Sequence, residues 1–229
     1  MEAIILAGGL GTRLRDVIKD TPKCLAEING NPFLFYVINN LQYNNVSRFI
    51  FSLGYLSQDV VYFLESNFKD LNYTCVIEDE PLGTGGAIKL ALKESTEEIV
   101  IITNADTYFN FNLNDLIKFH IQKKAIVSIC LVEMQNYDRY GTVLLNNDEI
   151  VIDFVEKKFT EKGTINAGFY CINKSHFLNK TLSMFNFSFE KDYIENEIVG
   201  NKIYGLLFSG TFIDIGIPED YYKAQLIKY

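Results

Sequence analysis

A glycine-rich segment near the N-terminus has the composition of a phosphate-binding loop. Leu6-Ala7-Gly8-Gly9-Leu10-Gly11-Thr12-Arg13-Leu14-Arg15 directly follows an apolar run, and Lys23 comes shortly after it. Glycines let backbone N–H groups approach a ligand closely, and successive N–H groups form a concave anion site. Arg13 and Lys23 would add positive charge where a triphosphate lies. A tight turn between a strand and a helix, with solvated basic residues, is the alternative.

Two familiar phosphate-binding motifs do not fit this loop. Counted from Gly9, the dinucleotide fingerprint G-x-G-x-x-G needs a small residue at the position of Leu14. The Walker A motif needs Gly-Lys-Ser/Thr at a spacing that the loop lacks. The segment therefore indicates phosphate binding of another kind.

Carboxylates follow two further apolar runs. Asp106 ends the segment Thr103-Asn104-Ala105-Asp106, and Glu78 begins the segment Glu78-Asp79-Glu80-Pro81-Leu82-Gly83-Thr84-Gly85-Gly86-Ala87. Mg²⁺ takes one or two carboxylates together with phosphate oxygens, so Asp106 could hold this ion beside the loop. An ordinary strand-end aspartate and a glycine-rich helix start are the alternatives.

The elements that must position these residues follow from an alternation of apolar runs and helical patterns. Strands are predicted at 3–7, 49–53, 73–77 and 99–103, and helices near 32–43, 57–67 and 84–93. This order indicates βαβ units and a parallel sheet covered by helices on both faces. Ligands of such a sheet bind at the carboxyl ends of its strands, where the loop, Glu78 and Asp106 stand.

The second half of the chain has a different rhythm. Four apolar runs follow one another with little helix between them, at 125–132, 141–145, 150–155 and 164–172, and indicate antiparallel hairpins. Two helices, around 189–199 and 218–228, are expected to close the chain. We therefore expect an α/β fold with a Rossmann-like mixed, mainly parallel sheet and antiparallel strands in the C-terminal half. No linker is visible, which predicts one domain over residues 1–229.

Composition excludes several classes of partner. The net charge of −8 argues against nucleic acid and against anionic membrane surfaces. No apolar run approaches the ~20 residues that span a bilayer. The four cysteines are scattered and the N-terminus has no basic region, which fits a protein of the reducing cytoplasm. The oligomeric state stays open, and a homo-oligomer is compatible with the sequence.

The loop L-A-G-G-L-G-T-R-L-R and the Pro22-Lys23 that follows resemble the signature of the nucleoside-diphosphate-sugar pyrophosphorylases, which are sugar-phosphate nucleotidyltransferases. The resemblance covers essentially the whole chain. It implies a GT-A-like nucleotidyltransferase fold, and a reaction that joins a nucleotide from an NTP to a sugar 1-phosphate and releases pyrophosphate. It also implies that Arg13 stabilises the pyrophosphate and that Lys23 contacts the phosphates, so both are catalytic together with Asp106 and Lys157.

The same resemblance assigns a Mg²⁺ ion to Asp106 and Asp214. The family usually has Gly where this chain has Ala105, and Phe212 and Ile217 replace a Trp and a Thr around Asp214. A cap of the last helix is the alternative role for Asp214. Glu78 begins the segment that reads the base, whose glycines admit the ring. The residues implied to bind the nucleotide are Leu6, Ala7, Gly8, Gly9, Gly11, Thr12, Arg13, Lys23, Glu78, Pro81, Gly83, Thr84 and Asp106.

Three further segments match the part of the family that binds the sugar phosphate. Y-G-T-V supplies Gly141, F-V-E-K supplies Glu156 and Lys157, and I-N-A-G supplies Asn166. The carboxylate would bind hydroxyls and the ammonium would bind phosphate, although Glu-Lys pairs are commonly solvated surface. Residues 1–120 are thus expected to bind mainly the nucleotide, and residues 121–229 mainly the sugar phosphate.

Within the family, the motifs E-D-E-P-L-G-T-G-G-A, R-Y-G-T-V, I-N-A-G and F-I-D-I-G-x-P-E-D-Y are most similar to a group of short guanylyltransferases. This likeness implies GTP and D-glycero-α-D-manno-heptose 1-phosphate as substrates. The product would be GDP-heptose for a capsule or lipopolysaccharide.

Three rival interpretations stay open from the sequence. The first is the same chemistry with another pair, such as CTP, UTP or dTTP with another sugar phosphate or phosphocholine. The second is a glycosyltransferase of related fold, but Asn104 stands where its Asp-x-Asp motif needs a carboxylate. The third is a non-catalytic sensor of sugar nucleotides, which has no need to keep Arg13, Lys23, Asp106 and Lys157.

Overall fold

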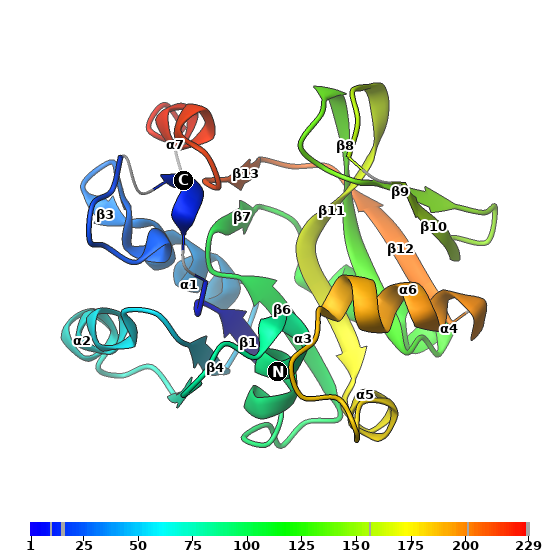
Figure 1. Ribbon diagram of the computed structural model, residues 1–229, viewed down its shortest axis with the longest axis horizontal. Helices are drawn as coiled ribbons and strands as arrows, with labels where there is room; N and C mark the ends of the chain where they lie inside the picture. The colour runs from blue at the N-terminus through cyan, green and yellow to red at the C-terminus, as the bar shows by residue number, and fades with distance from the viewer. Residues whose placement is uncertain (10, 15–16, 156, 201, 228–229) are drawn as a thin grey trace.

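The N-terminal part of the protein is a parallel sheet with helices on both faces (Figure 1). The computed structural model describes residues 1–229 except 10, 15–16, 156, 201 and 228–229. Four parallel strands lie side by side in the order β6 (Ile99–Asn104), β1 (Glu2–Leu6), β4 (Arg48–Leu53) and β5 (Tyr73–Ile77). The predicted strands and their parallel arrangement are confirmed.

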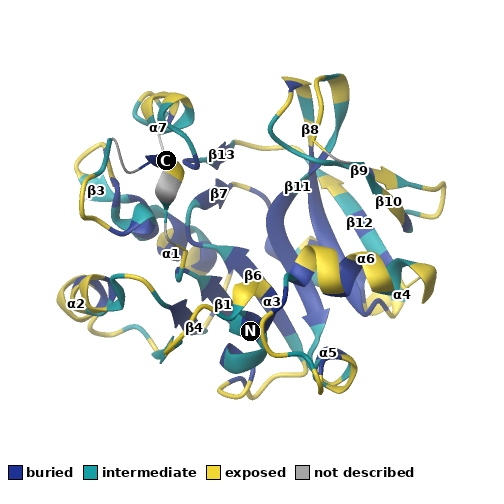
Figure 2. Cartoon of the chain, viewed as in Figure 1, coloured by how far each residue is buried: buried dark blue, intermediate teal, exposed yellow. Residues whose placement is uncertain are grey.

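Alternate residues of β1 face two different layers of the core. Ala3 and Ile5 belong to a core cluster with α1 (Phe33–Tyr43) and α2 (Ser57–Asn67). Ile4 belongs to the opposite cluster, with α3 (Gly83–Ala91). Because both faces are covered, the strand reads as an uninterrupted apolar run. Figure 2 shows the central strands buried and the outer surfaces of the helices exposed.

The C-terminal part extends the sheet with antiparallel strands, as expected. The long strand β11 (Thr160–Asn173) pairs antiparallel with β6 and with β8 (Val127–Tyr137). A hairpin of β9 (Thr142–Leu145) and β10 (Val151–Val155) joins β11 through the pairing of Thr142 with Ile165. A further strand that the sequence did not predict, β12 (Ile203–Phe208), runs parallel to β8.

The longest helix of this part is α4 (Leu113–Lys123), with 11 residues. The helices α5 (Lys174–Lys180) and α7 (Pro218–Ala224) have 7 residues each. The helix expected around 189–199 is a continuous helical stretch of three types, namely a π-helical turn η3 (Phe189–Ile194), α6 (Glu195–Glu197) and a 3-10 turn η4 (Ile198–Gly200). No helix in the described ranges has both the length and the apolar composition of a membrane span.

Two pairs of very short strands complete the fold. One pair is β2 (Glu27–Ile28) with β3 (Asn31–Pro32), and the other is β7 (Thr107–Phe109) with β13 (Phe212–Asp214). In the second pair Asp214 lies opposite Thr107. The last motif of the chain is thereby brought beside the carboxyl end of β6. Two 3-10 turns, η1 (Thr12–Leu14) and η2 (Lys23–Leu25), follow β1.

A buried carboxylate fixes the amino end of the parallel sheet. Glu2 is 3% exposed, and it accepts hydrogen bonds from Arg48 Nη1 at 2.7 Å and from Ser95 Oγ at 2.5 Å. The Thr96 hydroxyl and backbone N–H add bonds of 2.8 and 2.9 Å. Burial alone raises the pKa of Glu2, but these hydrogen bonds outweigh it and lower the pKa to about 2.

We expect Glu2→Gln to lower the free energy of unfolding by about 3 kcal/mol at pH 7, since a lowered carboxylate pKa is linked to stability. The stabilisation is present above pH 4.5 and is lost as the pH falls toward 2. The difference between the two proteins should therefore shrink to less than half by pH 3. Urea unfolding at both pH values measures it, with the exposed Glu65→Gln as a control. A difference independent of pH would contradict the assignment.

Candidate active site

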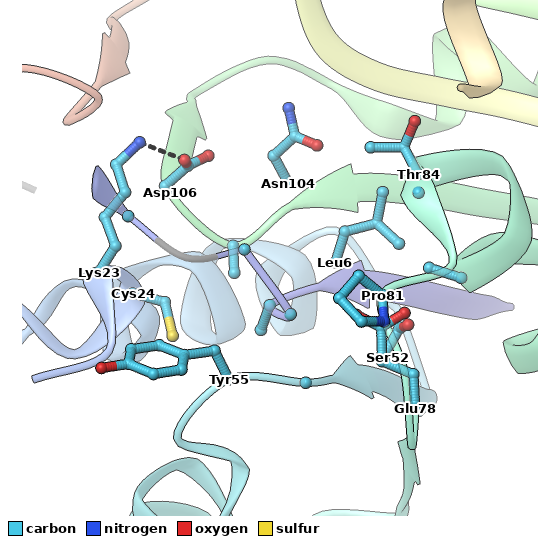
Figure 3. Close-up of a pocket in the computed structure, with 18 of the residues that line it drawn as sticks. Leu6, Lys23, Cys24, Ser52, Tyr55, Glu78, Pro81, Thr84, Asn104 and Asp106 are labelled. Carbon is cyan, nitrogen blue, oxygen red and sulfur yellow. Dashed lines mark hydrogen bonds and ion pairs between the residues drawn. The ribbon is translucent and has the colours of Figure 1, made fainter. Parts of the chain in front are cut away.

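A cavity of about 700 Å³ opens at the carboxyl ends of β1, β4, β5 and β6. Nearly all the residues predicted to bind the nucleotide line it, namely Leu6, Ala7, Gly8, Gly9, Gly11, Arg13, Lys23, Glu78, Pro81, Gly83, Thr84 and Asp106. Thr12 begins η1, and its side chain lies outside the described part of the structure. Figure 3 shows Lys23 and Asp106 at one end of the cavity, with Glu78 and Pro81 at the other.

The Glu78 side chain packs closely against two glycines at the strand ends, where a Cβ atom would be in its way. A Cβ atom on Gly8 would lie 3.0 Å from Glu78 Oε1, and one on Gly54 would lie 2.7 Å from the same oxygen. Glu78 Oε2 accepts the Leu82 N–H at 3.2 Å. Burial raises the pKa of Glu78, and the Leu82 hydrogen bond opposes this shift. The carboxylate is therefore held in a fixed position at the cavity wall.

The glycines at the start of α3 have a role that the sequence did not reveal. Gly85 and Gly86 are buried, and Cβ atoms there would lie 2.2 Å from the Phe187 ring and 2.4 Å from the Phe185 carbonyl oxygen. Backbone hydrogen bonds link Gly85 N–H to Phe187 O and Phe187 N–H to Leu82 O, at 2.9 and 3.0 Å. These two glycines admit a neighbouring chain segment, and so does Gly83, which also lines the cavity and whose added Cβ would lie 2.5 Å from the Phe187 carbonyl oxygen.

Two carboxylates and one ammonium meet at the other end of the cavity. Lys23 Nζ forms an ion pair with Asp106 and lies 3.8 Å from Asp214 Oδ1. Asp214 Oδ1 also accepts the Gly216 N–H at 2.7 Å. The Ile215 N–H donates to the Asp106 carbonyl oxygen at 3.1 Å, which fixes the two acidic segments side by side. Asp106 and Asp214, predicted from distant motifs, are thus brought together.

The charges of Asp106 and Lys23 both act on the Asp214 carboxylate. Burial raises the pKa of Asp214, and the nearby negative charge of Asp106 raises it further. Lys23 and the hydrogen bonds from Gly216 and Tyr140 act in the opposite direction. Two carboxylates that repel each other in a partly buried site are stabilised by any cation placed between them.

The donor set fits a divalent cation that also binds phosphate. Only two carboxylates meet here, and no group of three or more metal-ligating side chains occurs among the described residues. Hard cations of this kind complete their coordination with water and phosphate oxygens. The alternative role of Asp214 as a helix cap does not hold, because the N-cap of α7 is Ile217 and no side chain caps that helix.

Tyr140 is a site residue that sequence reasoning missed. Its hydroxyl donates to Asp214 Oδ2 at 3.1 Å, and Arg139 lies over its ring at 5.0 Å. Arg139 in turn forms an ion pair with Asp220 of α7. The Y-G-T-V motif was singled out for Gly141 alone, and nothing in its pattern indicated a partner 74 residues away.

The segments predicted to bind the sugar phosphate meet through strand register. Thr142 of β9 pairs with Val155 of β10 and with Ile165 of β11. Gly141, whose added Cβ would lie 3.0 Å from the Val155 carbonyl oxygen, therefore neighbours the ends of the other two segments. Glu156 lies outside the described residues. Lys157 is exposed in the turn after β10 and does not line the cavity.

Asn166 lies in β11, and hydrogen bonds fix both ends of its side-chain amide. Its side-chain oxygen accepts the Gly168 N–H at 2.9 Å, and its Nδ2 donates to Tyr170 Oη at 2.7 Å. The same nitrogen donates to Glu190 Oε1 at 2.6 Å. Neither Tyr170 nor Glu190 was singled out from the sequence, since the bond to Glu190 joins two elements with no common motif.

Other cavity residues were also missed. Ser52, Gly54 and Tyr55 follow or end β4, and Cys24 follows Lys23. The rule that ligands bind at the carboxyl ends of parallel strands could have indicated the end of β4. Its short apolar run simply carried no motif.

The chain belongs to the nucleotidyl transferase family, whose model matches residues 2–228. This finding confirms the resemblance and the enzyme class.

Individual relatives are similar over nearly the whole chain. A D-glycero-α-D-manno-heptose 1-phosphate guanylyltransferase of Aneurinibacillus thermoaerophilus is 44% identical, covering 98% of this chain and 97% of the relative. The enzyme of the same name from Campylobacter jejuni is 40% identical, covering 97% of each. The crystal structure of HddC from Yersinia pseudotuberculosis complexed with GMP-PN superposes with a TM-score of 0.87 at 35% identity, covering 98% of both chains. The predicted fold is confirmed.

We expect Asp106→Asn and Asp214→Asn each to lower kcat by at least ~100-fold, which is about 2.7 kcal/mol. Asparagine at position 214 can keep the hydrogen bond from Gly216, and its NH₂ group can donate to the Tyr140 hydroxyl, but it lacks the charge that holds a cation. Pyrophosphate release over a titration of divalent cation measures the effect, with the exposed Asp70→Asn as a control. Near-normal turnover and cation dependence in Asp214→Asn would leave that residue a purely structural role.

Proposed function

We propose that the protein transfers GMP from GTP to D-glycero-α-D-manno-heptose 1-phosphate, which gives GDP-heptose and pyrophosphate. The observation that carries this proposal is the placement of Glu78 at one end of a cavity whose other end holds Lys23 and Asp106 (Figure 3). A nucleoside triphosphate has the same polarity, with a base at one end and phosphates at the other. The names of the two relatives and the GMP-PN complex of HddC support guanine and heptose.

The nucleophile needs no general base. The second pKa of a phosphate monoester is about 6, so a sugar 1-phosphate is largely dianionic at neutral pH. One of its oxygens attacks the α-phosphorus of GTP in line, and the bond to the β-phosphate oxygen breaks on the opposite side. Pyrophosphate leaves with that electron pair. Catalysis then consists mainly of positioning two polyanions and neutralising their charge.

Basic residues supply much of that neutralisation. Arg13 lies in the cavity wall and would balance the charge that grows on pyrophosphate. Lys23, now paired with Asp106, would hold phosphate oxygens when substrate is bound. Lys157 would approach the sugar phosphate from the turn after β10. Asp106 and Asp214 would hold Mg²⁺, which supplies charge stabilisation for the phosphates when bound.

We also propose a division of labour between the two halves of the single domain. Residues 1–120 contribute the glycine-rich loop, Glu78 and Asp106, and would bind mainly the nucleotide. Residues 121–229 contribute Gly141, Asn166 and the segment containing Glu156 and Lys157, and would bind mainly the sugar phosphate. The product is an activated sugar, which suits a cytoplasmic step before the synthesis of capsule or lipopolysaccharide.

The direct test is pyrophosphate release with four NTPs and a panel of sugar 1-phosphates. We expect the highest kcat/KM for GTP with D-glycero-α-D-manno-heptose 1-phosphate. Preference for another pair, such as CTP with phosphocholine, would replace the substrates but keep the chemistry. No release with any pair would refute the proposal in favour of a non-catalytic sensor.

The base preference rests on Glu78. Guanine presents two adjacent donors, N1–H and the 2-amino group, which a carboxylate can accept as a bidentate pair. Glutamine suits the donor–acceptor edge of uracil or thymine instead. Adenine and cytosine offer a carboxylate only one donor group beside a lone pair.

We therefore expect Glu78→Gln to cost roughly 1–3 kcal/mol in kcat/KM for GTP, through a lost charged hydrogen bond or an unpaired donor. The amide oxygen can still accept the Leu82 N–H. The effect on UTP should be smaller or even favourable. The ratio of kcat/KM for GTP to that for UTP measures the change, and the neighbouring Glu80→Gln is the control. An unchanged ratio in Glu78→Gln would show that Glu78 does not read the base.

A further inference from the structure

A polar cluster of Asn166, Tyr170 and Glu190 lies beside the cavity, and Tyr170 and Glu190 have no role in the proposed function so far. Glu190 Oε1 accepts two hydrogen bonds of 2.6 Å, one from Asn166 Nδ2 and one from Tyr170 Oη. Tyr170 is buried, Asn166 is half-buried and Glu190 is exposed. An exposed carboxylate is thus anchored by one oxygen to two side chains of the sheet.

The second oxygen of Glu190 is available to a ligand. Within the described part of the chain, no group donates a hydrogen bond to Oε2. None of the ion pairs among the described residues includes Glu190 either, so the carboxylate has no fixed counter-charge. A carboxylate offers about four acceptor positions, and those on Oε2 point to no protein partner.

Two irregularities of the backbone create this arrangement. The pairing of β11 with β8 shifts register between Asn166 and Tyr170, and a bulge of this kind re-aims the side chains beside it. Glu190 itself lies in the π-helical turn η3, a rare conformation that is frequent at functional sites. Both irregularities place their side chains at the same point.

Backbone contacts fix the cluster at the edge of the cavity. The Phe189 N–H donates to Thr84 Oγ1 at 2.9 Å, and Thr84 lines the cavity. On the other side, a Cβ on Gly168 would lie 2.7 Å from the side-chain nitrogen of Asn104, which also lines the cavity. Glu190 therefore follows Phe189, which is bonded to the wall residue Thr84, and Asn166 is bonded to Gly168, which packs against the wall residue Asn104.

We propose that Glu190 is a specificity-determining residue, whose free oxygen accepts a hydrogen bond from one hydroxyl of the sugar 1-phosphate. This inference rests on the proposed function and names the chemistry that selects the sugar. Asn166 and Tyr170 are positioning residues that hold the carboxylate in place. The site selects a substrate that carries a hydroxyl donor there and disfavours one with a deoxy carbon or an acceptor-only substituent, because such a substrate would displace water from the exposed carboxylate without supplying a donor in its place.

The decisive variant is Glu190→Gln. Its amide oxygen can keep accepting from Asn166 and Tyr170, whereas the free acceptor becomes an NH₂ donor. The variant is compared with wild type on the parent sugar 1-phosphate and on analogues that each lack one hydroxyl. Glu195→Gln, an exposed change five residues further along, is the matched control. Calorimetric binding of the same analogues keeps the comparison independent of turnover.

We expect Glu190→Gln to raise the KM for the parent sugar phosphate by about 10-fold or more, while the KM for GTP stays unchanged. One deoxy analogue should show the same loss in wild type and no further loss in the variant. Tyr170→Phe should show a smaller loss on the same analogue series.

If Glu190→Gln weakened binding of the parent sugar phosphate and of every analogue equally, Glu190 would have only a structural role. If the variant weakened binding of none of them, the contact with a sugar hydroxyl would be excluded. Either result overturns the inference while an active wild type leaves the proposed function intact. If wild type released no pyrophosphate from any pair, the proposed function would fall, and the binding comparison would still decide the role of Glu190.

Discussion

The site depends on two carboxylates that are held together against their mutual repulsion. Asp106 follows β6 and Asp214 ends β13, and Lys23 contacts both. The three residues come from segments far apart in the chain, and a pair of three-residue strands brings them into contact. The ammonium group of Lys23 supplies the positive charge that offsets the repulsion between the two carboxylates. The carboxylates therefore keep their spacing in the free protein. Substrate phosphates would then draw Lys23 away from Asp106.

Much of the nucleotide side could be predicted because its signals are local. The apolar runs of β1, β5 and β6 are each followed at once by a recognisable motif, so the order of residues gives the place of each side chain. The same reasoning could not find Tyr140, because its bond to Asp214 joins the segment between β8 and β9 to the distant strand β13. The pairing of β7 with β13 was equally hidden, since three residues carry no periodicity.

The part proposed to bind the sugar phosphate is built by strand register and irregular backbone, which sequence patterns report poorly. Gly141, Val155 and Ile165 meet because β9 lies between β10 and β11, and a shift of one residue would separate them. The bulge after Asn166 and the π-helical turn at Glu190 interrupt regular patterns. Their positions became evident only from hydrogen bonds across the fold. Lys157 remains assigned by resemblance, exposed beyond the cavity wall.

The interlock between the start of α3 and residues 185–187 limits how this enzyme could be rebuilt. Gly85 and Gly86 leave no room for a side chain, because Phe187 and the Phe185 backbone occupy that space. The segment that follows Glu78 and the segment that leads to Glu190 are therefore packed and hydrogen-bonded together, so that neither can move without the other. If the segment after Glu78 were replaced by that of a relative that uses another nucleotide, the segment that leads to Glu190 would be displaced as well. A change of base preference alone would therefore require both segments to be transplanted together. In relatives that use another nucleotide, we expect the two segments to have changed together.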